Sequence, residues 1–387
     1  MQVIQTKKNI ILSWANSMEE EALKQLGNAA EHPCVDKPVV ACPDVHTGYG
    51  VTIGCVLPVS AALIPNAVGV DIGCSMSACR TNIEASLVDK KALESIVNTI
   101  RSHIPTGCTH HTAKQVHKIF DDIDRWNSCK ICASEFESAQ YQIGTMGGGN
   151  HFIELQAGDD GFLYYMIHSG SRNLGYKVGN YYNKVASELC HRWRQDKVVE
   201  DQLAFLPKGE PEYEEYFKEM KLCLDFAKAN HELMQQIIEY ILSANLQNIE
   251  FKQKWYTRHN YADIENHSGL NLVIHRKGAI LARTGMEQII PGSQGTASYI
   301  VEGLGNPKSY CSASHGSGRV MSRKQAKESL SLKEEQSKMK GIIHNMNSVK
   351  QLDEAPSAYK DIEEVLTLEE DLVKPVVRLR PLAVIKG

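Results

Sequence analysis

Two short motifs each place a histidine beside small residues and an arginine. The first is His-Ser-Gly-Ser-Arg at His168–Arg172, and the second is His-Gly-Ser-Gly-Arg at His315–Arg319. Glycines let backbone N–H groups approach a ligand closely, and serine and arginine add donors that suit phosphate. An imidazole in that setting is a candidate nucleophile or metal ligand beside a bound phosphate. The two motifs therefore predict phosphate chemistry.

A second group of residues offers a mixed set of metal donors. Each has an ordinary alternative explanation, as a turn aspartate, a small buried cysteine or a hydrogen-bonded histidine. Together they supply thiolate, imidazole and carboxylate, which suits a divalent transition ion better than magnesium or calcium, and a thiolate can bridge two cations. The residues are Asp71, Cys74, His151, His168 and His259.

A run of three glycines, Gly147–Gly149, precedes Asn150, His151 and Glu154. Three consecutive glycines cost conformational entropy, so a ligand or a close contact usually requires them. On an extended segment His151 and Glu154 point to opposite faces, so a turn or bulge is needed if both meet one ligand. The alternative is a flexible loop before a strand.

Two further segments have more than one possible role. The small polar residues from Pro291 to Ser298 line a nucleotide pocket or form a plain turn, and they do not match a Walker A motif. Cys129 and Cys132 have the spacing of a zinc or redox pair, but no second pair follows them. We therefore interpret these two cysteines as surface or structural residues.

Composition limits the function classes. The chain has 387 residues, 42% of them hydrophobic, which is enough to bury a large core in two domains or in one domain with insertions. The formal net charge of −4 counts against a protein that coats nucleic acid, but not against an enzyme that acts on RNA ends. Eleven cysteines at irregular spacings favour reduced thiols, and no apolar run approaches the roughly 20 residues of a membrane helix. We expect a cytoplasmic protein without membrane contact.

The elements that must position these residues follow from hydrophobic periodicity. Strand-like segments cover 39–59, 162–167 and 271–301, and the apolar end of the chain, 384–387, packs its last strand inward; His168 follows the strand at 162–167, and His259 follows a helical region. Because the polar motifs extend from residue 44 to the end, they must converge in one α+β catalytic domain spanning 1–387, with central sheets flanked by helices. A helix or helical hairpin at 212–247 is predicted as an excursion, its apolar stripe serving core packing. The other predicted helices cover 18–31, 86–103, 113–141, 322–338 and 354–370.

The ordered set of motifs resembles the RtcB family of RNA-splicing ligases over essentially the full length of the chain. Many motifs in one order are far more specific than any single motif. The matching stretches are Pro43–Gly50, Gly69–Cys74, Gly149–Glu154, His168–Arg172, His259–Tyr261, Arg276–Ala279, Pro291–Ser293, Ser314–Gly316, Ala358–Asp361 and Lys386–Gly387.

The resemblance implies a GTP-dependent ligase that uses manganese and joins an RNA 3′-phosphate, or a 2′,3′-cyclic phosphate opened first, to a 5′-hydroxyl. It implies that the five metal candidates hold two manganese ions bridged by Cys74, and that His315 is the nucleophile that takes GMP from GTP. It leaves open whether an activating protein such as archease is needed. The implied guanylate-site residues are Asn150, His151, Phe152, Ile153, Glu154, His259, Asn260, Pro291, Gly292, Ser293, Gln294, Ser298, His315, Gly316, Ser317, Gly318 and Lys386.

The implied chemistry is consistent with the residue types. Neutral His315 attacks the α-phosphate, GMP passes to the RNA 3′-phosphate, and the RNA 5′-hydroxyl then displaces GMP. Glu154 can accept from guanine N–H groups, which would select GTP over ATP, and Lys386 contacts the base or its neighbours. Backbone N–H groups near Gly316 and Gly318, helped by Arg319, would stabilise the transferring phosphoryl group.

The chain departs from the family pattern at three places. Ser317 stands where many relatives have alanine, Gln294 where many have methionine, and residues 104–111 where relatives carry arginines. The first two changes could shift nucleotide affinity, and the third bears on RNA-end affinity or substrate choice. Two rival hypotheses are a metal-dependent phosphoesterase that opens cyclic phosphates without sealing, which would not need His315, and a non-catalytic RNA-binding scaffold, which would have lost its metal ligands.

Overall fold

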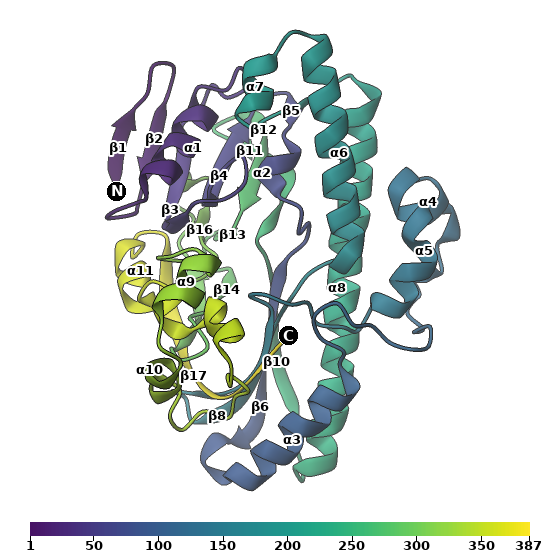
Figure 1. The fold of residues 1–387 in the computed structure, drawn as a ribbon, viewed down its shortest axis with the longest axis vertical. Helices are drawn as coiled ribbons and strands as arrows, with labels where there is room; N and C mark the ends of the chain where they lie inside the picture. Colours follow the sequence, from purple (N-terminus) through teal and green to yellow (C-terminus); the bar gives the residue numbers. More distant parts are fainter.

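The computed structural model describes residues 1–387 and has an α+β fold built on two large β-sheets. Figure 1 shows the six-stranded sheet in the upper half of the molecule and the seven-stranded sheet in the lower half, with long helices along one side. The six-stranded sheet has the order β1-β2-β3-β4-β12-β11, and only its β2–β3 pair is parallel. Its strands are β1 (Gln2–Gln5), β2 (Ile10–Ser13), β3 (Val39–His46), β4 (Ile53–Val59), β11 (Asn260–His267) and β12 (Leu270–Lys277).

The seven-stranded sheet is antiparallel throughout, in the order β10-β6-β8-β7-β17-β15-β14. It curls so far that its two edge strands touch, because the Ile289 amide of β14 donates to Thr257 Oγ1 of β10 at 3.1 Å. The result is nearly a closed barrel with an apolar interior. The strands are β6 (Ser75–Glu84), β7 (Phe152–Gly158), β8 (Phe162–Ser169), β10 (Phe251–Arg258), β14 (Glu287–Ile290), β15 (Ser298–Gly303) and β17 (Val373–Lys386).

Antiparallel pairing brings distant segments to one end of this sheet. Neighbouring strands run in opposite directions, so the start of one strand lies beside the end of the next. His168 near the end of β8 therefore pairs with both Met76 at the start of β6 and Phe152 at the start of β7. Phe152 in turn lies opposite Lys386 at the end of β17. The ends of four strands that are far apart in the chain thus lie together at one end of the sheet, where the candidate residues lie.

Two smaller strand pairs and eleven α-helices complete the fold. In Figure 1, α6 and α8 run side by side along one flank, while α9, α10 and α11 lie on the other. The small pairs are β5 (Ala62–Leu63) with β9 (Leu206–Pro207), and β13 (Ala279–Leu281) with β16 (Ser312–Ser314). The helices are α1 (Glu20–Ala30), α2 (Pro65–Val68), α3 (Lys90–His103), α4 (Ile123–Asn127), α5 (Lys130–Gln142), α6 (Arg172–Arg192), α7 (Asp196–Glu200), α8 (Pro211–Asn245), α9 (Arg323–Ser329), α10 (Leu332–Lys338) and α11 (Ile362–Leu368).

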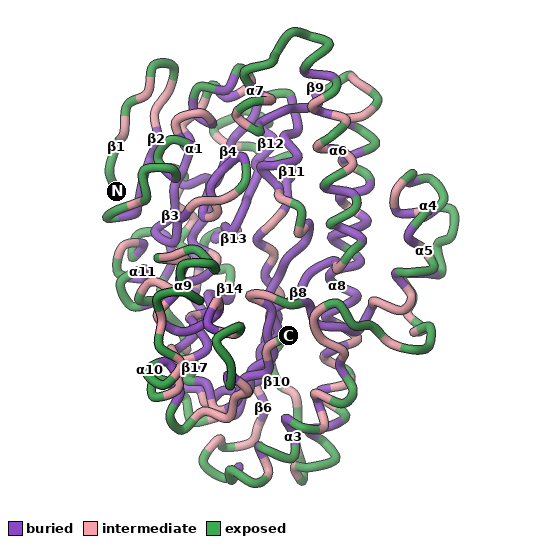
Figure 2. Tube along the Cα trace, viewed as in Figure 1, coloured by how far each residue is buried: buried purple, intermediate pink, exposed green.

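The long helix predicted at 212–247 is a single helix, α8, rather than a hairpin. It begins with Pro211 in its first turn, where the missing N–H costs nothing. Its predicted apolar stripe is core: Met220 and Leu224 belong to the largest hydrophobic cluster, and Met234 and Ile238 belong to a second cluster around α3 and β8. Figure 2 shows that buried residues follow α8 over its length, so the helix packs along the body of the protein.

The strand predictions and the helix at 18–31 are confirmed, as β3, β4, β8, β12–β15, β17 and α1. The helix predicted at 86–103 begins only at Lys90, because the Asp89 side chain caps it by accepting from the Ala92 amide at 2.8 Å. The helix predicted at 322–338 is divided at Leu330 into α9 and α10.

Three expectations about elements are wrong. The helix predicted at 113–141 is two helices, α4 and α5, because Asp122 caps a new helix at 3.0 Å from the Arg125 amide. The helix predicted at 354–370 is only α11, because Pro356 interrupts the segment and Asp361 caps at 3.0 Å. His259 does not follow a helix; it lies between β10 and β11, where the chain passes from one sheet to the other. None of the helices combines the length and hydropathy needed to cross a membrane.

Candidate active site

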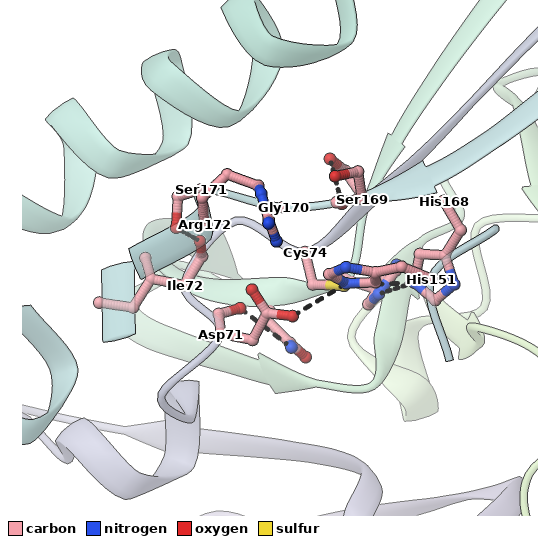
Figure 3. A network of polar contacts seen from close by, with 12 residues as sticks. Asp71, Ile72, Cys74, His151, His168, Ser169, Gly170, Ser171 and Arg172 are labelled. Atoms are coloured by element: carbon pink, nitrogen blue, oxygen red, sulfur yellow. Dashed lines mark hydrogen bonds and ion pairs between the residues drawn. The ribbon is translucent and has the colours of Figure 1, made fainter. Parts of the chain in front are cut away.

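The five predicted metal donors converge at the shared end of the seven-stranded sheet. Asp71 lies in the turn after α2, Cys74 directly precedes β6, and His151 directly precedes β7. His168 is on β8, and His259 joins the two sheets. All except Asp71 are buried, so the donor atoms face a site that is largely closed to solvent. Figure 3 shows Asp71, Cys74 and His151 directed toward one another, with His168 beside them.

The donor atoms form two groups that share the Cys74 thiol. The Cys74 Sγ lies 3.2 Å from His168 Nε2, which lies 3.3 Å from His259 Nε2. On the other side, Cys74 Sγ lies 3.3 Å from His151 Nε2, which lies 3.1 Å from Asp71 Oδ2. Within each group of three, all ligand atoms lie within 4.8 Å of one another. The arrangement suits two cations that share one thiolate.

Two glycines are required by close approaches around these donors. A Cβ at Gly147 would lie 2.0 Å from His151 Nδ1, so this member of the glycine run leaves room for the imidazole. A Cβ at Gly170, in the first His-Ser-Gly-Ser-Arg motif, would lie 2.5 Å from Asp71 Oδ1. The motif glycine therefore packs directly against the metal candidates. A turn places His151 just before β7, because its amide donates to the Gly148 carbonyl.

Burial sets the protonation of the donors. It lowers the pKa of His168 and His259 well below the usual value, and the neighbouring imidazoles lower it further. Neutral imidazoles are the form that binds metals. Burial and the Asp71 charge raise the pKa of the Cys74 thiol, so a cation would be needed to hold it as a thiolate. The Asp71 pKa is lowered despite burial, because His151 donates to the carboxylate. This donor set fits divalent transition ions.

His315 lies beside this cluster, directly after β16. Its ring centroid is 4.8 Å from that of His259. Its Nδ1 lies 2.6 Å from Oδ2 of the buried Asp44, and its own amide donates to the same oxygen at 3.2 Å. A carboxylate acceptor at Nδ1 fixes the proton there and leaves the lone pair on Nε2. His315 is therefore set up to act as a nucleophile.

His315 opens into a cavity of about 460 Å³, which is lined by strands of both large sheets, by the start of α9 and by Glu354 and Tyr359. The motif Gly316–Gly318 and the loop Pro291–Gln294 form two of its walls. A cluster of charged side chains forms a third wall: Glu354 contacts Arg319 at 3.3 Å, Arg323 at 3.4 Å and Lys386 at 3.3 Å, and it accepts from the Tyr359 hydroxyl. Small donors, cations and a nucleophile around one cavity suit a nucleotide.

Comparison with known proteins agrees with this chemistry. The family model described as tRNA-splicing ligase RtcB matches residues 25–131 and 121–387. The chain is 33% identical over 408 residues to the RNA-splicing ligase RtcB of Escherichia coli strain K12, covering 100% of this chain and 99% of the relative.

This chain belongs to the RtcB family. The tRNA-splicing ligase RtcB of Nanoarchaeum equitans is 30% identical over 446 residues, covering 95% of this chain and 92% of the relative. The RtcB of Aeropyrum pernix is 28% identical over 445 residues, covering 95% of this chain and 92% of the relative.

Most of the nucleotide residues that the RtcB resemblance implies line the cavity. Gly316–Gly318 stand next to His315, and Phe152 lies beneath Lys386, whose Nζ is 5.8 Å from the ring centroid. Arg319 also lines the cavity, but its guanidinium donates to Glu354 and to the Asp353 carbonyl. It therefore braces the cavity wall. The implied residues that line the cavity are Asn150, Phe152, Pro291, Gly292, Ser293, Gln294, His315, Gly316, Ser317, Gly318 and Lys386.

Six implied residues do not line the cavity. Ile153 packs in a core cluster on the other face of β7. Glu154 is buried, accepts from Gln156 Nε2 at 2.7 Å, and has its pKa raised to about 8 by burial. Asn260 donates to the Asp71 carbonyl at 3.2 Å and accepts from the Gly278 amide, so it holds the turn that carries Asp71. Ser298 accepts from the Gly292 amide at 3.3 Å. His151 and His259 face the donor cluster instead.

Sequence reasoning missed two acids. Asp44 was inside a matched motif, but its contact with His315 spans 271 residues of chain and has no local signal. Glu354 lies at the end of a short 3-10 helix, Val349–Glu354, and no pattern distinguished it from other surface acids. Its pKa is lowered despite burial, because Lys386 and Arg323 face it. Both acids are visible only once the fold is known.

The three departures from the family pattern all lie near the site. Ser317 has a buried hydroxyl without a hydrogen-bond partner, and Gln294 donates to the Glu354 carbonyl at 2.6 Å. Residues 107–110 line a second cavity, of about 490 Å³, together with Asp71, His151 and Arg172. The metal candidates are thus accessible from a side that is separate from the His315 cavity.

Proposed function

We propose that this protein is an RNA ligase that uses GTP and two manganese ions. It would join RNA 3′-phosphate or 2′,3′-cyclic phosphate ends to 5′-hydroxyl ends, in RNA repair or tRNA splicing. Residues 1–387 would act as one catalytic domain, because the site draws side chains from Asp44 to Lys386. Membership of a family described as tRNA-splicing ligases supports the reaction class.

The observation that carries the proposal is the position of His315 between two features. On one side its ring lies against His259 of the donor cluster, and on the other it opens into the cavity with its Nδ1 held by Asp44. A nucleophile beside a metal cluster and a nucleotide-sized cavity is what nucleotidyl transfer requires. Manganese held by Asp71, Cys74, His151, His168 and His259 would supply Lewis-acid polarisation of the phosphate.

The residues themselves account for the transfer steps. His315 Nε2 forms a bond to the α-phosphorus of GTP while pyrophosphate leaves, and the Asp44 carboxylate stabilises the positive charge that develops on the imidazole. The RNA 3′-phosphate then takes GMP from His315, which returns to its neutral form. The RNA 5′-hydroxyl attacks the activated 3′-phosphate and releases GMP, which leaves a 3′,5′-phosphodiester. The Lys386–Glu354 wall would hold the guanine end.

The alternative, a phosphoesterase that opens cyclic phosphates without sealing, needs the donor cluster but not the cavity. The buried Asp44 opposite His315 favours ligation, because burying a carboxylate costs free energy and here it serves only the His315 side chain and amide. Activation by a protein such as archease is part of the proposal and rests on the family resemblance alone. A cytoplasmic location is also proposed, because eleven irregularly spaced cysteines favour reduced thiols.

The test is guanylylation of the protein. Incubated with manganese and α-labelled GTP, the wild-type chain is expected to form an acid-labile guanylate adduct, and His315→Ala is expected to form none. His191→Ala is the matched control, because His191 is exposed on α6 and pairs only with Asp196. A wild-type level of adduct on the His315→Ala variant would place the nucleophile elsewhere and contradict the proposal.

A further inference from the structure

Asn230 lies in the middle of α8 and is completely buried. Its Oδ1 accepts from the amides of Gly144 and Thr145 at 2.7 and 3.0 Å. Its Nδ2 donates to the carbonyls of Thr145 and Gly170 at 3.1 and 3.0 Å, and to Ser169 Oγ at 3.2 Å. Amides on one side and carbonyls on the other fix the orientation of the side chain. Every hydrogen-bonding position of this amide is therefore used.

The groups that Asn230 holds lead directly to the metal candidates. Ser169 and Gly170 follow His168, and Figure 3 shows them beside Cys74. Gly170 packs so tightly that a Cβ there would lie 2.5 Å from Asp71 Oδ1 and 3.3 Å from the Cys74 Cα. A shift of the Gly170 peptide would therefore change its packing against both Asp71 and Cys74.

The second segment held by Asn230 continues toward His151. Thr145 accepts from Arg172 Nε at 2.9 Å and precedes the glycine run, in which Gly147 packs against His151 Nδ1. One amide thus connects the backbone on both sides of the donor cluster. Such a network in a low-dielectric interior holds its members in one geometry, because a buried polar group that loses its partner is costly in free energy.

We propose that Asn230 is a positioning residue for the metal centre, holding the Thr145 and Gly170 peptides so that Asp71, Cys74, His151 and His168 converge on the cations. This inference rests on the proposed function in one respect, because it requires that the donor cluster binds metal. It does not need GTP or RNA. Mutation of residues that orient metal ligands without binding the metal typically weakens metal affinity by about 10- to 100-fold.

The test uses Co²⁺ as the probe on full-length, metal-free protein. The thiolate-to-cobalt charge-transfer band reports whether Cys74 binds the ion, independently of ligase activity. Asn230→Ala is expected to weaken Co²⁺ binding at least about 10-fold and to reduce the band. Asn245→Ala is the matched control, because Asn245 lies on the same helix and bonds only to the Ile241 carbonyl. It is expected to bind Co²⁺ like the wild type.

A second variant tests the same hydrogen-bond network with a smaller change, in case Asn230→Ala does not fold. Ser169→Ala removes one of the five hydrogen bonds and is expected to weaken Co²⁺ binding about threefold. Thermal melts establish which variants are folded, and if Asn230→Ala does not fold, Ser169→Ala decides. Wild-type affinity and an unchanged band in the folded variants would overturn the role of Asn230. A wild-type protein without the band would instead overturn the metal centre itself, and with it the proposed function.

Discussion

The contact between Asp44 and His315 shows how one hydrogen bond decides what an imidazole can do. Asp44 is fully buried, and its Oδ2 faces both the Nδ1 and the amide of His315. A carboxylate accepts only, so it selects the tautomer with the proton on Nδ1. The lone pair is then on Nε2, which the proposed mechanism uses for attack on GTP. An amide at position 44 could instead donate to Nδ1 and place the proton on the attacking nitrogen.

Asp44→Asn is therefore expected to slow formation of the His315 adduct by about 10²- to 10⁴-fold, with little change in the KM for GTP. Single-turnover labelling with GTP at several concentrations separates the two quantities. Asp36→Asn is the control, because the exposed Asp36 accepts only from Ser60 Oγ. An adduct rate within threefold of wild type would show that Asp44 does not select the tautomer.

At the scale of elements, β17 both completes a sheet and closes the cavity. It lies between β7 and β15, and its register places Lys386 opposite Phe152. Ala383, Val384 and Ile385 just before Lys386 are buried. The strand therefore stabilises the fold through the buried residues 383–385, while its last side chain, Lys386, reaches Glu354 in the cavity wall. The two roles belong to different residues and can be separated.

Removal of only Lys386 and Gly387 is expected to leave the protein folded and to raise the KM for GTP about 10- to 100-fold, since one charged contact is lost. Removal of 380–387 is expected to abolish folding, because the strand then loses its pairing with β7. Circular dichroism melts and adduct kinetics distinguish the two outcomes. An unchanged KM in the shorter deletion would contradict a nucleotide contact for Lys386.

At the scale of the whole molecule, several histidines are buried as neutral groups far apart in the fold. Burial lowers the pKa of His32, His46, His231 and His275 to about 4. His231, for example, lies between Ser77 Oγ at 2.8 Å and the Ser169 carbonyl at 3.2 Å. The carbonyl requires a proton on Nε2, so Nδ1 accepts from the serine. Burial makes the charged form of such a ring costly in the folded state.

These pKa values predict acid sensitivity. Between pH 6.5 and about 4 the unfolded chain binds protons that the folded chain excludes, so the free energy of unfolding falls as pH falls through that window. Each of the four histidines contributes a slope of up to about 1.4 kcal/mol per pH unit. Urea unfolding at pH 7, 6 and 5 measures this. His32→Gln should reduce the slope and the exposed His191→Gln should not; a stability that is flat over this range would refute the prediction.

The sequence alone predicted the kind of chemistry and most of the elements. Hydrophobic periodicity predicted α1, α8 and most strands, because these segments bury one face over their whole length. Residue types and spacing predicted the five metal candidates, and they marked His315 as a nucleophile or metal ligand beside the small polar loops that line the cavity. The helices predicted at 113–141 and 354–370 were too long. Asp122 and Asp361 cap new helices inside these segments, and periodicity does not mark such capping positions.

Only the tertiary structure decided which side chains meet. Asp44 reaches His315, Glu354 reaches Lys386, and Asn230 reaches Gly170 across tens to hundreds of residues. The tertiary structure also places Glu154 outside the cavity, although Glu154 is only two residues from Phe152, which lines it. Spacing along the chain governs periodicity within one helix or strand, whereas contacts between elements depend on strand order and register, which no local pattern encodes.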